Sequence, residues 1–205
     1  MIKAIYNNSA YYIPISNLRG NKKEYLAIKF DTGAVNTVLS FSALVGNPKF
    51  LGISEDKFVE QLKNMRGITT KTFKAANGKT MIGYLCCAKD VIIGGCKFDK
   101  FFYYLICNIE RNLALLGDDF ISCCSFEHKV NSNIEITHFD TKHYKINEDK
   151  EKNCISEVIF DELLELSKIG VDEPIHSAYS DKTLYSDAEI EEEVFRYTID
   201  NEDTI

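Results

Sequence analysis

The sequence lacks a hydrophobic run long enough to cross a membrane. Its longest apolar stretch, Phe101–Cys107, is far shorter than the roughly 18 to 20 residues that a spanning helix needs. The N-terminal segment MIKAIYNNSAYYIP also lacks the continuous apolar core and the small-residue cleavage site of a signal peptide. We therefore expect a cytoplasmic protein that has no membrane partner.

An excess of positive charge is also missing. The 205 residues include 24 Lys and Arg against 31 Asp and Glu, a net charge of -7, which argues against a nucleic-acid-binding protein with a basic surface. The charge changes sign along the chain, from +4 over residues 1–140 to -11 over residues 141–205. This break and the polar stretch beside it predict a domain of residues 1–140, a linker of residues 141–153 and a C-terminal extension of residues 154–205.

The ligand spacing of a metal site is absent as well. No CxxC or HxxxH pattern occurs, and the best local grouping is Cys123 and Cys124 near His128. The cysteines are odd in number, with two adjacent pairs, and no export signal precedes them, so we expect reduced thiols that pack as small apolar residues. We expect no metal and no cofactor. The seven cysteines are Cys86, Cys87, Cys96, Cys107, Cys123, Cys124 and Cys154.

Short strand-like segments separated by turn residues dominate residues 1–140. Residues 10–17 (AYYIPISN) and 24–30 (EYLAIKF) are rich in Ile and Tyr, as strands are. Three hairpins are expected, with turns at Asn77-Gly78, at Gly94-Gly95 and around Asn131–Asn133. Asn-Gly is the strongest of these signals because both residues can adopt positive φ. The pattern predicts a mainly β sandwich or barrel.

Helices are expected in three places. Residues 54–65 begin with Ser54 as a plausible N-cap, and residues 117–122 (GDDFIS) can form a single turn. Residues 155–170 repeat apolar side chains at helical spacing, which predicts an amphipathic helix. The apolar stripe of that helix is Ile155, Ile159, Leu163 and Leu166, with Val158 beside it.

The acidic residues that follow this helix allow three interpretations: a solvated extension, a helix from Ile155 packed on the barrel or on a dimer mate, or a segment that occupies a cleft or binds a partner. The helical stripe favours packing of the helix with a loose acidic end.

An aspartate stands directly after one strand-like segment. The stretch YLAIKFDTGAVNT, residues 25–37, leads from apolar residues into Asp31 and then into Thr32, Gly33 and Ala34. A carboxylate in such a place is costly unless it is paired or hydrogen-bonded. It is either a turn aspartate that bonds its own backbone or a catalytic acid.

Two further segments follow this turn in a definite order. The Asn77-Gly78 hairpin comes next, and then ALLGDDFI, residues 114–121. The ordered set resembles the retropepsin-like (retroviral-type, clan AA) aspartic proteases, in which a strand ends in D-T/S-G-A/S, a hairpin flap follows, and an apolar-apolar-Gly segment leads into a helix. The resemblance covers residues 1–140. It implies a single-lobe acid-protease β-barrel with a flap hairpin, to which this chain adds a helical, acidic C-terminal extension.

The resemblance implies an aspartic endopeptidase whose catalytic residue is Asp31. It implies that Thr32 hydrogen-bonds across to a partner strand and that Gly33 lets backbone approach the carboxylates closely. The residues implied to support the active-site loop are Thr32, Gly33, Ala34, Leu115, Leu116 and Gly117. The residues implied to contact substrate from the flap are Ala76, Asn77, Gly78 and Lys79.

The mechanism of this family needs two aspartates, and the chain contains one D-T-G. The other Asp-Thr pair, Asp140-Thr141, is followed by Lys142. The resemblance therefore implies a C2 homodimer with Asp31 from each copy at the axis and a peptide or protein substrate. The alternative is a catalytically silent, acid-protease-like module for dimerisation or peptide binding.

Two positions depart from the viral pattern together. Viral enzymes commonly carry an acidic residue where Val35 stands and an Arg where Asp118 stands, so their internal ion pair cannot form here. This favours a non-viral member of the family and leaves the dimer to be stabilised in another way. We interpret Asp118 and Asp119 as acidic residues at a helix start rather than as metal ligands.

Overall fold

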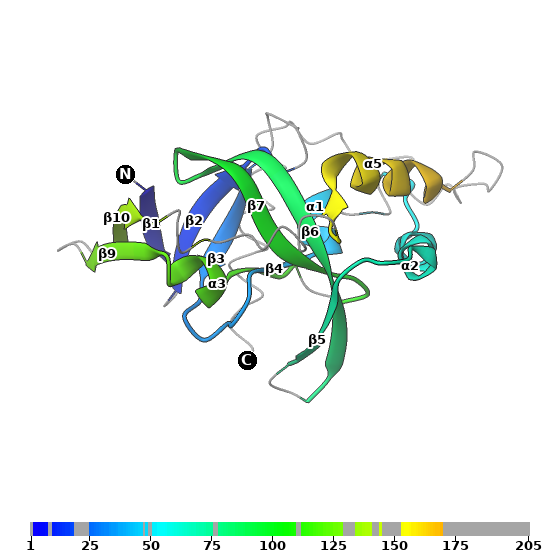
Figure 1. Ribbon diagram of the computed structural model, residues 1–205, viewed down its shortest axis with the longest axis horizontal. Coiled ribbons are helices and arrows are strands. Elements are labelled where there is room, and N and C mark those ends of the chain that lie inside the picture. The colour runs from blue at the N-terminus through cyan, green and yellow to red at the C-terminus, as the bar shows by residue number, and fades with distance from the viewer. Residues whose placement is uncertain are drawn as a thin grey trace, which may run out of the picture.

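The structure is a computed structural model of the 205-residue chain (Figure 1). It describes residues 2–7, 10–18, 25–46, 48, 51–75, 78–109, 112–128, 134–140, 144 and 153–169.

Six of the described strands close into a barrel. They are β2 (Ala10–Ser16), β3 (Tyr25–Phe30), β4 (Val38–Ser40), β6 (Thr80–Ile93), β7 (Cys96–Ile106) and β8 (Ala114–Leu116). The strand order is β6-β7-β4-β8-β3-β2, and pairing of β2 with β6 closes the ring. The β3–β8 and β4–β7 pairs are parallel, whereas the other pairs of the ring are antiparallel. The predicted mainly β barrel is confirmed.

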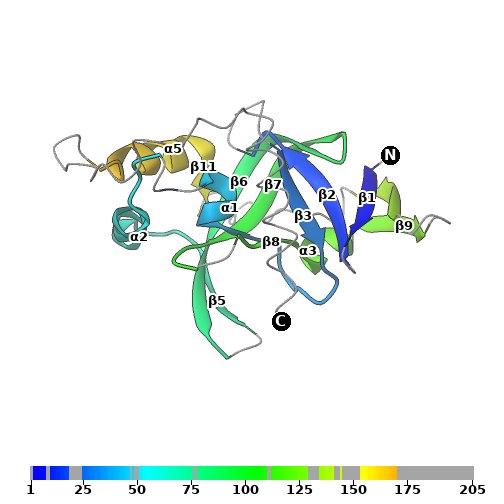
Figure 2. The same ribbon diagram turned by 180° about the vertical axis from the view of Figure 1, so that it is seen from behind.

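Other strands extend this barrel at its edges. β1 (Ile2–Asn7) pairs with β2 through its second half and with β10 (Ile134–Phe139) through its first half, and β10 pairs with β9 (Cys124–His128). β5 (Thr70–Lys74) pairs with the start of β6, and β11 (Ile155–Ser156) lies parallel to the middle of β6. Figure 2 shows β1 and β9 at one end of the molecule and α2 and α5 at the other.

The predicted hairpins are present. β5 and β6 form one, and β6 and β7 form a second that turns at Gly94 and Gly95, which have φ values of 55° and 88°. Two successive positive φ values match the right-handed twist of the flanking strands. β9 and β10 form the third, whose predicted turn, Asn131–Asn133, lies outside the described residues.

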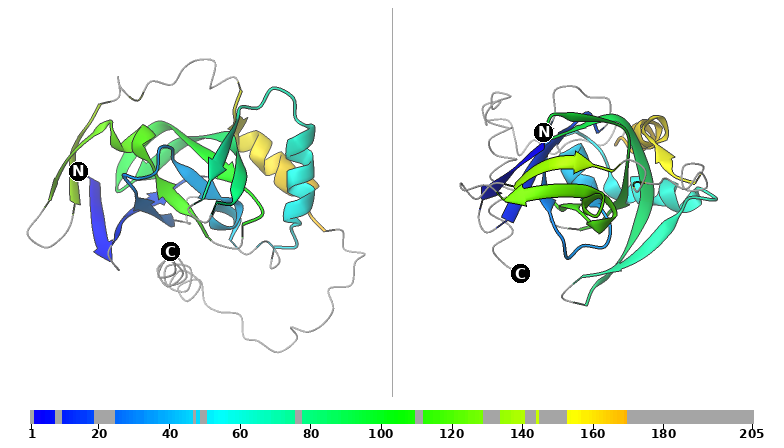
Figure 3. Two further views of the ribbon diagram at one scale, coloured as in Figure 1. Left: turned by 90° about the horizontal axis from the view of Figure 1, so that it is seen from below. Right: turned by 60° about the vertical axis from the view of Figure 1, so that its left-hand side comes forward.

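The described helices are short and lie mainly at one end of the barrel (Figure 3). They are α1 (Phe41–Val45), α2 (Glu55–Asn64), α3 (Asp118–Ile121) and α5 (Glu157–Leu166). As predicted, Ser54 caps α2, because its hydroxyl accepts the Lys57 N–H. Ser40 caps α1 in the same way, although α1 had no expected counterpart. No helix among the described residues is long and apolar enough to cross a membrane.

The core joins the helices to the barrel. Phe41, Phe58, Phe101 and Phe120 are fully buried. The Phe58 ring of α2 lies 4.6 Å from the Phe41 ring and 5.3 Å from the Phe160 ring of α5, measured between centroids. Such aromatic contacts contribute about 0.5–1.5 kcal/mol each beyond the area that they bury, so α5 packs on the barrel domain.

The predicted buried stripe of α5 was partly wrong. The helix buries Phe160, Leu163 and Leu164, whereas Val158 and Leu166 are 67% and 64% exposed. The reason is that the helix begins only at Glu157, after strand β11, and Phe160 docks against α2. That contact rotates the helix so that Val158 and Leu166 point outward.

Candidate active site

Asp31 leaves the barrel at the end of β3, where β3 meets β8. Phe30 is the register partner of Leu116, and the Asp31 N–H donates to the Leu116 carbonyl at 3.0 Å. The parallel pairing of these two strands thus brings Asp31 beside Gly117, although 86 positions separate them in sequence. The loop of residues 31–37 and the β5–β6 hairpin project on the same side of the barrel (Figures 1 and 2).

The first residues of this loop form a tight turn around the Asp31 carboxylate. The Gly33 N–H donates to Asp31 Oδ1 at 2.9 Å, and the Ala34 N–H donates to the Asp31 carbonyl at 3.2 Å. A Cβ on Gly33 would lie 3.2 Å from Oδ1, tighter than an ordinary contact. Asp31 is therefore a turn aspartate that bonds its own backbone. This turn uses Oδ1 and does not engage Oδ2, so the turn interpretation and the catalytic interpretation are compatible.

The end of the loop is held by a second carboxylate, that of Asp119. Thr37 is fully buried. Its N–H donates to Asp119 Oδ1 at 2.8 Å and Oδ2 at 3.0 Å, and its hydroxyl donates to Oδ1 at 2.7 Å. The Thr37 hydroxyl in turn accepts the Gly117 N–H at 3.1 Å. Charge-assisted hydrogen bonds of this kind are about twice as strong as neutral ones, so the loop is fixed at both ends.

Sequence reasoning missed this pair. We interpreted Asp119 only as a helix-start acid, and we assigned no role to Thr37. The sequence signal is a polar residue, Thr37, directly before the strand-like run Val38–Ser40. That signal alone could not identify Asp119 as the partner of Thr37, because the two residues are 82 positions apart in the sequence.

Gly117 occupies a place where no side chain fits. A Cβ there would lie 2.3 Å from the Asn36 carbonyl carbon, 2.5 Å from its oxygen and 2.7 Å from the Thr37 nitrogen. The adjacent Leu116 is fully buried, and Leu115 pairs with both β3 and β4. Leu116 and Gly117 therefore contact the Asp31 loop, whereas Leu115 lies between β3 and β4.

The β5–β6 hairpin is anchored to the same loop. Lys71 Nζ donates to Asn36 Oδ1. The Phe73 ring packs on the Tyr104 ring with centroids 5.3 Å apart, and the Tyr104 N–H donates to the Thr37 carbonyl at 2.9 Å. Burial and, to a smaller extent, the nearby Asp119 carboxylate raise the pKa of Tyr104, so this phenol is neutral at physiological pH.

The tip of the hairpin is described in part. Ala76 and Asn77 lie outside the described residues. Gly78 has a φ of 82° and donates its N–H to the Ala75 carbonyl at 2.8 Å, while the Ala75 N–H donates to the Lys79 carbonyl at 2.9 Å. Gly78 and Lys79 are exposed. The positive φ at Gly78 is what an Asn-Gly turn requires.

The two positions that depart from the viral pattern face outward. Val35 is 71% exposed, and Asp118 is exposed. The Asp118 N–H donates to the Ala34 carbonyl at 2.7 Å, so a backbone bond joins the loop to α3 in addition to the Asp119 side chain. Among the described residues, no three His, Cys, Asp or Glu side chains gather as a metal site.

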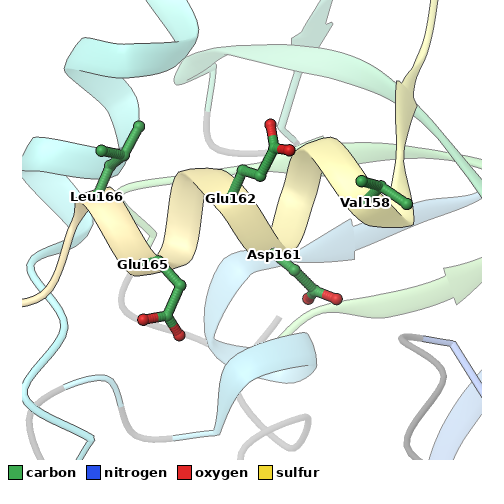
Figure 4. Close-up of a pocket in the computed structure, with 5 residues that line it drawn as sticks. All are labelled: Val158, Asp161, Glu162, Glu165 and Leu166. Carbon is green, nitrogen blue, oxygen red and sulfur yellow. The ribbon is translucent and has the colours of Figure 1, made fainter.

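A hollow elsewhere on the surface contains no residue of this site. Its lining comes from the outer face of α5 (Figure 4). All the lining residues belong to one helix and none belongs to the Asp31 loop or the β5–β6 hairpin, so we assign this surface no chemistry. The residues are Val158, Asp161, Glu162, Glu165 and Leu166.

Comparison with protein-family models and with curated proteins finds no match. Solved structures do align with the chain. One is a retropepsin-like aspartic protease from Rickettsia conorii, with 18% identity over 65% of this chain and 95% of that one and a TM-score of 0.42. Another is the retroviral protease-like domain of Ddi1 from Leishmania major, with 13% identity over 62% and 88% and a TM-score of 0.34. With similarity this low, the fold assignment rests on the chain's own barrel topology.

Proposed function

We propose that this chain is a retropepsin-like aspartic endopeptidase in which Asp31 is the catalytic residue. One observation carries the proposal: the D-T-G-A turn sits at the mouth of a closed barrel with its carboxylate half-buried and its loop held at both ends. A plain surface turn does not need this second, buried attachment at Thr37 and Asp119. A catalytic carboxylate does, because it must be held in a productive geometry.

The proposed reaction requires a second copy of Asp31. Two carboxyl groups about 3 Å apart cannot both ionise, so the pair shares one proton. The ionised member takes a proton from a water that attacks the scissile carbonyl, and the protonated member polarises that carbonyl. We therefore propose a C2 homodimer in which each copy contributes one Asp31 at the axis.

The proposed dimer also implies roles for the other loop and hairpin residues. Thr32 and Gly33 are exposed in the single chain, where a second copy and a peptide backbone would approach. The β5–β6 hairpin would close on the substrate as a flap and exclude water, with Gly78 and Lys79 near its tip. Ala34 and the segment Leu115–Gly117 would support the loop from below.

We also propose that the protein works in the cytoplasm. All seven cysteines, each within the described residues, are thiols rather than disulfides. Burial raises the pKa of Cys86 well above its ordinary value and that of Cys124 to about 12. Such thiols are inert core residues, as a reducing compartment permits.

The test is cleavage of a diverse peptide library by wild type and by Asp31→Asn, between about pH 4 and 7.5. Asn keeps the shape of the side chain but removes the ionisable group. We expect cleavage by wild type and none by the variant at equal dimer content, measured by light scattering. Equal cleavage by both would place the activity elsewhere. Binding without cleavage by either would support the silent peptide-binding module.

A further inference from the structure

The β5–β6 hairpin has two chemically different sides. Register pairs Lys71 with Gly83 and Phe73 with Met81, whereas Lys74 pairs with Thr80 on the opposite side. Since alternate residues of a strand point to opposite faces, Lys71, Phe73, Met81 and Gly83 share one side. We call this the inner side of the hairpin.

Three contacts show that the inner side faces the Asp31 loop and the barrel. Lys71 bonds Asn36 of the loop, and Phe73 packs on Tyr104. A Cβ on Gly83 would lie 2.6 Å from the Phe73 ring and 3.1 Å from Tyr104 Cβ, so the lack of a side chain at Gly83 makes room for the Phe73 ring beside Tyr104. The outer side, with exposed Lys74, faces away.

The inner side carries positive charge at both ends. Lys71 stands at the base of the hairpin. Lys79 lies opposite Ala75, because the Ala75 N–H bonds its carbonyl, and alternation from Met81 places Lys79 on the inner side. Both lysines are exposed, while Phe73 and Met81 between them are half-buried. A peptide strand under the hairpin would therefore meet ammonium groups at both ends of an apolar patch.

The hairpin itself adds no opposing charge, because residues 70–84 contain no Asp or Glu. On the facing elements, the Asp119 carboxylate accepts from the buried Thr37 and from the Asn36 amide. In the proposed dyad, two copies of Asp31 hold one proton between them. Among the described residues of the loop and α3, the other carboxylate is that of the exposed Asp118. Lysines rather than carboxylates therefore face a peptide from the side of the hairpin.

We propose that Lys71 and Lys79 are specificity-determining residues that select acidic peptide segments, an inference that rests on the proposed endopeptidase function. The chain itself contains such a segment. Residues 170–205 hold 11 Asp and Glu against two Lys and Arg, and they include the apolar pair Val194-Phe195. A peptide of residues 186–203 is therefore a suitable probe.

The experiment compares this peptide with one in which its four central glutamates, Glu189, Glu191, Glu192 and Glu193, are glutamines. The readout is the ratio of the two kcat/KM values for the full chain, measured with both peptides in one reaction. A ratio is used because any binding of the chain's own tail lowers both values equally. The same ratio is taken for dissociation constants with the Asp31→Asn chain, by fluorescence anisotropy.

We expect both ratios to favour the acidic peptide, and we expect Lys71→Ala and Lys79→Ala to lower them by about two- to fivefold each, as exposed ion pairs allow. Lys74 lies on the outer side of the same strand. The variant Lys74→Ala is therefore the matched control and should change neither ratio. Added salt should reduce the preference, because it screens exposed charges.

The two readouts separate this proposal from the proposed function. No hydrolysis, together with a Lys71-dependent binding ratio, would overturn the peptidase and keep the acidic-peptide surface. Hydrolysis with equal ratios for both peptides, or with equal effects of Lys71→Ala and Lys74→Ala, would overturn the selectivity and keep the peptidase. If neither hydrolysis nor a Lys71-dependent binding ratio is found, both proposals fail.

Discussion

Replacing Asp119 with alanine tests whether the far end of the Asp31 loop is held as the structure indicates. The change removes the acceptor of the Thr37 N–H and of the Thr37 hydroxyl. Thr37 is fully buried, so water cannot readily replace the lost acceptor. An unsatisfied buried donor costs about 1–3 kcal/mol, and hydrogen bonds to charged groups fall in the upper part of the range.

We therefore expect Asp119→Ala to lower the free energy of unfolding by roughly 3 kcal/mol. For a chain of this size that corresponds to a fall in Tm of about 6 to 12 °C. The measurement is urea and thermal unfolding followed by circular dichroism. Peptide cleavage should fall as well, because the same loop carries Asp31.

Two control variants make this result interpretable. Asp119→Asn keeps one acceptor oxygen for Thr37 and should recover most of the lost stability. Asp118→Ala removes the adjacent, exposed carboxylate and should change stability by less than about 0.5 kcal/mol. If Asp119→Ala were as stable as Asp118→Ala, the Thr37–Asp119 contact would not hold the loop and our reasoning would be refuted.

Three other predictions concern separate parts of the molecule. Gly117→Ala should cost at least about 2 kcal/mol in urea unfolding, since its Cβ would lie within 2.7 Å of backbone atoms of two residues; near-wild-type stability would contradict this. Burial raises the pKa of Glu55 above 4.5, so the folded state binds the proton more tightly. The stabilisation that protonated Glu55 gives the folded state is complete below about pH 4.5 and is lost as pH rises through the higher folded pKa. Glu55→Gln should therefore reduce the loss of unfolding free energy as pH rises above about 4.5. An unchanged pH dependence would show that Glu55 does not cause this loss. In native protein, the half-exposed Cys96 should react with iodoacetamide before Cys86 and Cys107, whose pKa values burial raises; mass spectrometry of the alkylated peptides would reveal any other order.

Features governed by neighbouring residues were predictable from the sequence. The Gly94-Gly95 turn needs two positive φ values, and these residues adopt them. Ser54 caps α2 through a residue three positions away. The ordered set of the D-T-G-A turn, the hairpin and the Leu-Leu-Gly segment resembles the retropepsin-like proteases, and that resemblance implied the single-lobe barrel.

Features that depend on contacts between distant segments were not predictable. The closure of the barrel pairs β2 with β6 at Ile15 and Ile93. The local sequence of neither strand predicts this partner. The outward rotation of α5 depends on Phe160 docking against Phe58. An apolar stripe counted along the helix cannot anticipate which of two adjacent faces this contact will bury.

The sequence by itself determined the turn chemistry and the cap of α2, because each depends on residues within a few positions of one another. It also identified the candidate acid, through the ordered set of segments that resembles a known family. The tertiary structure alone decided how that acid is held. The pairing of Thr37 with Asp119 and the absence of space for a side chain at Gly117 arise from segments about 80 positions apart. Their contact exists only once parallel pairing of β3 with β8 has brought the two segments together.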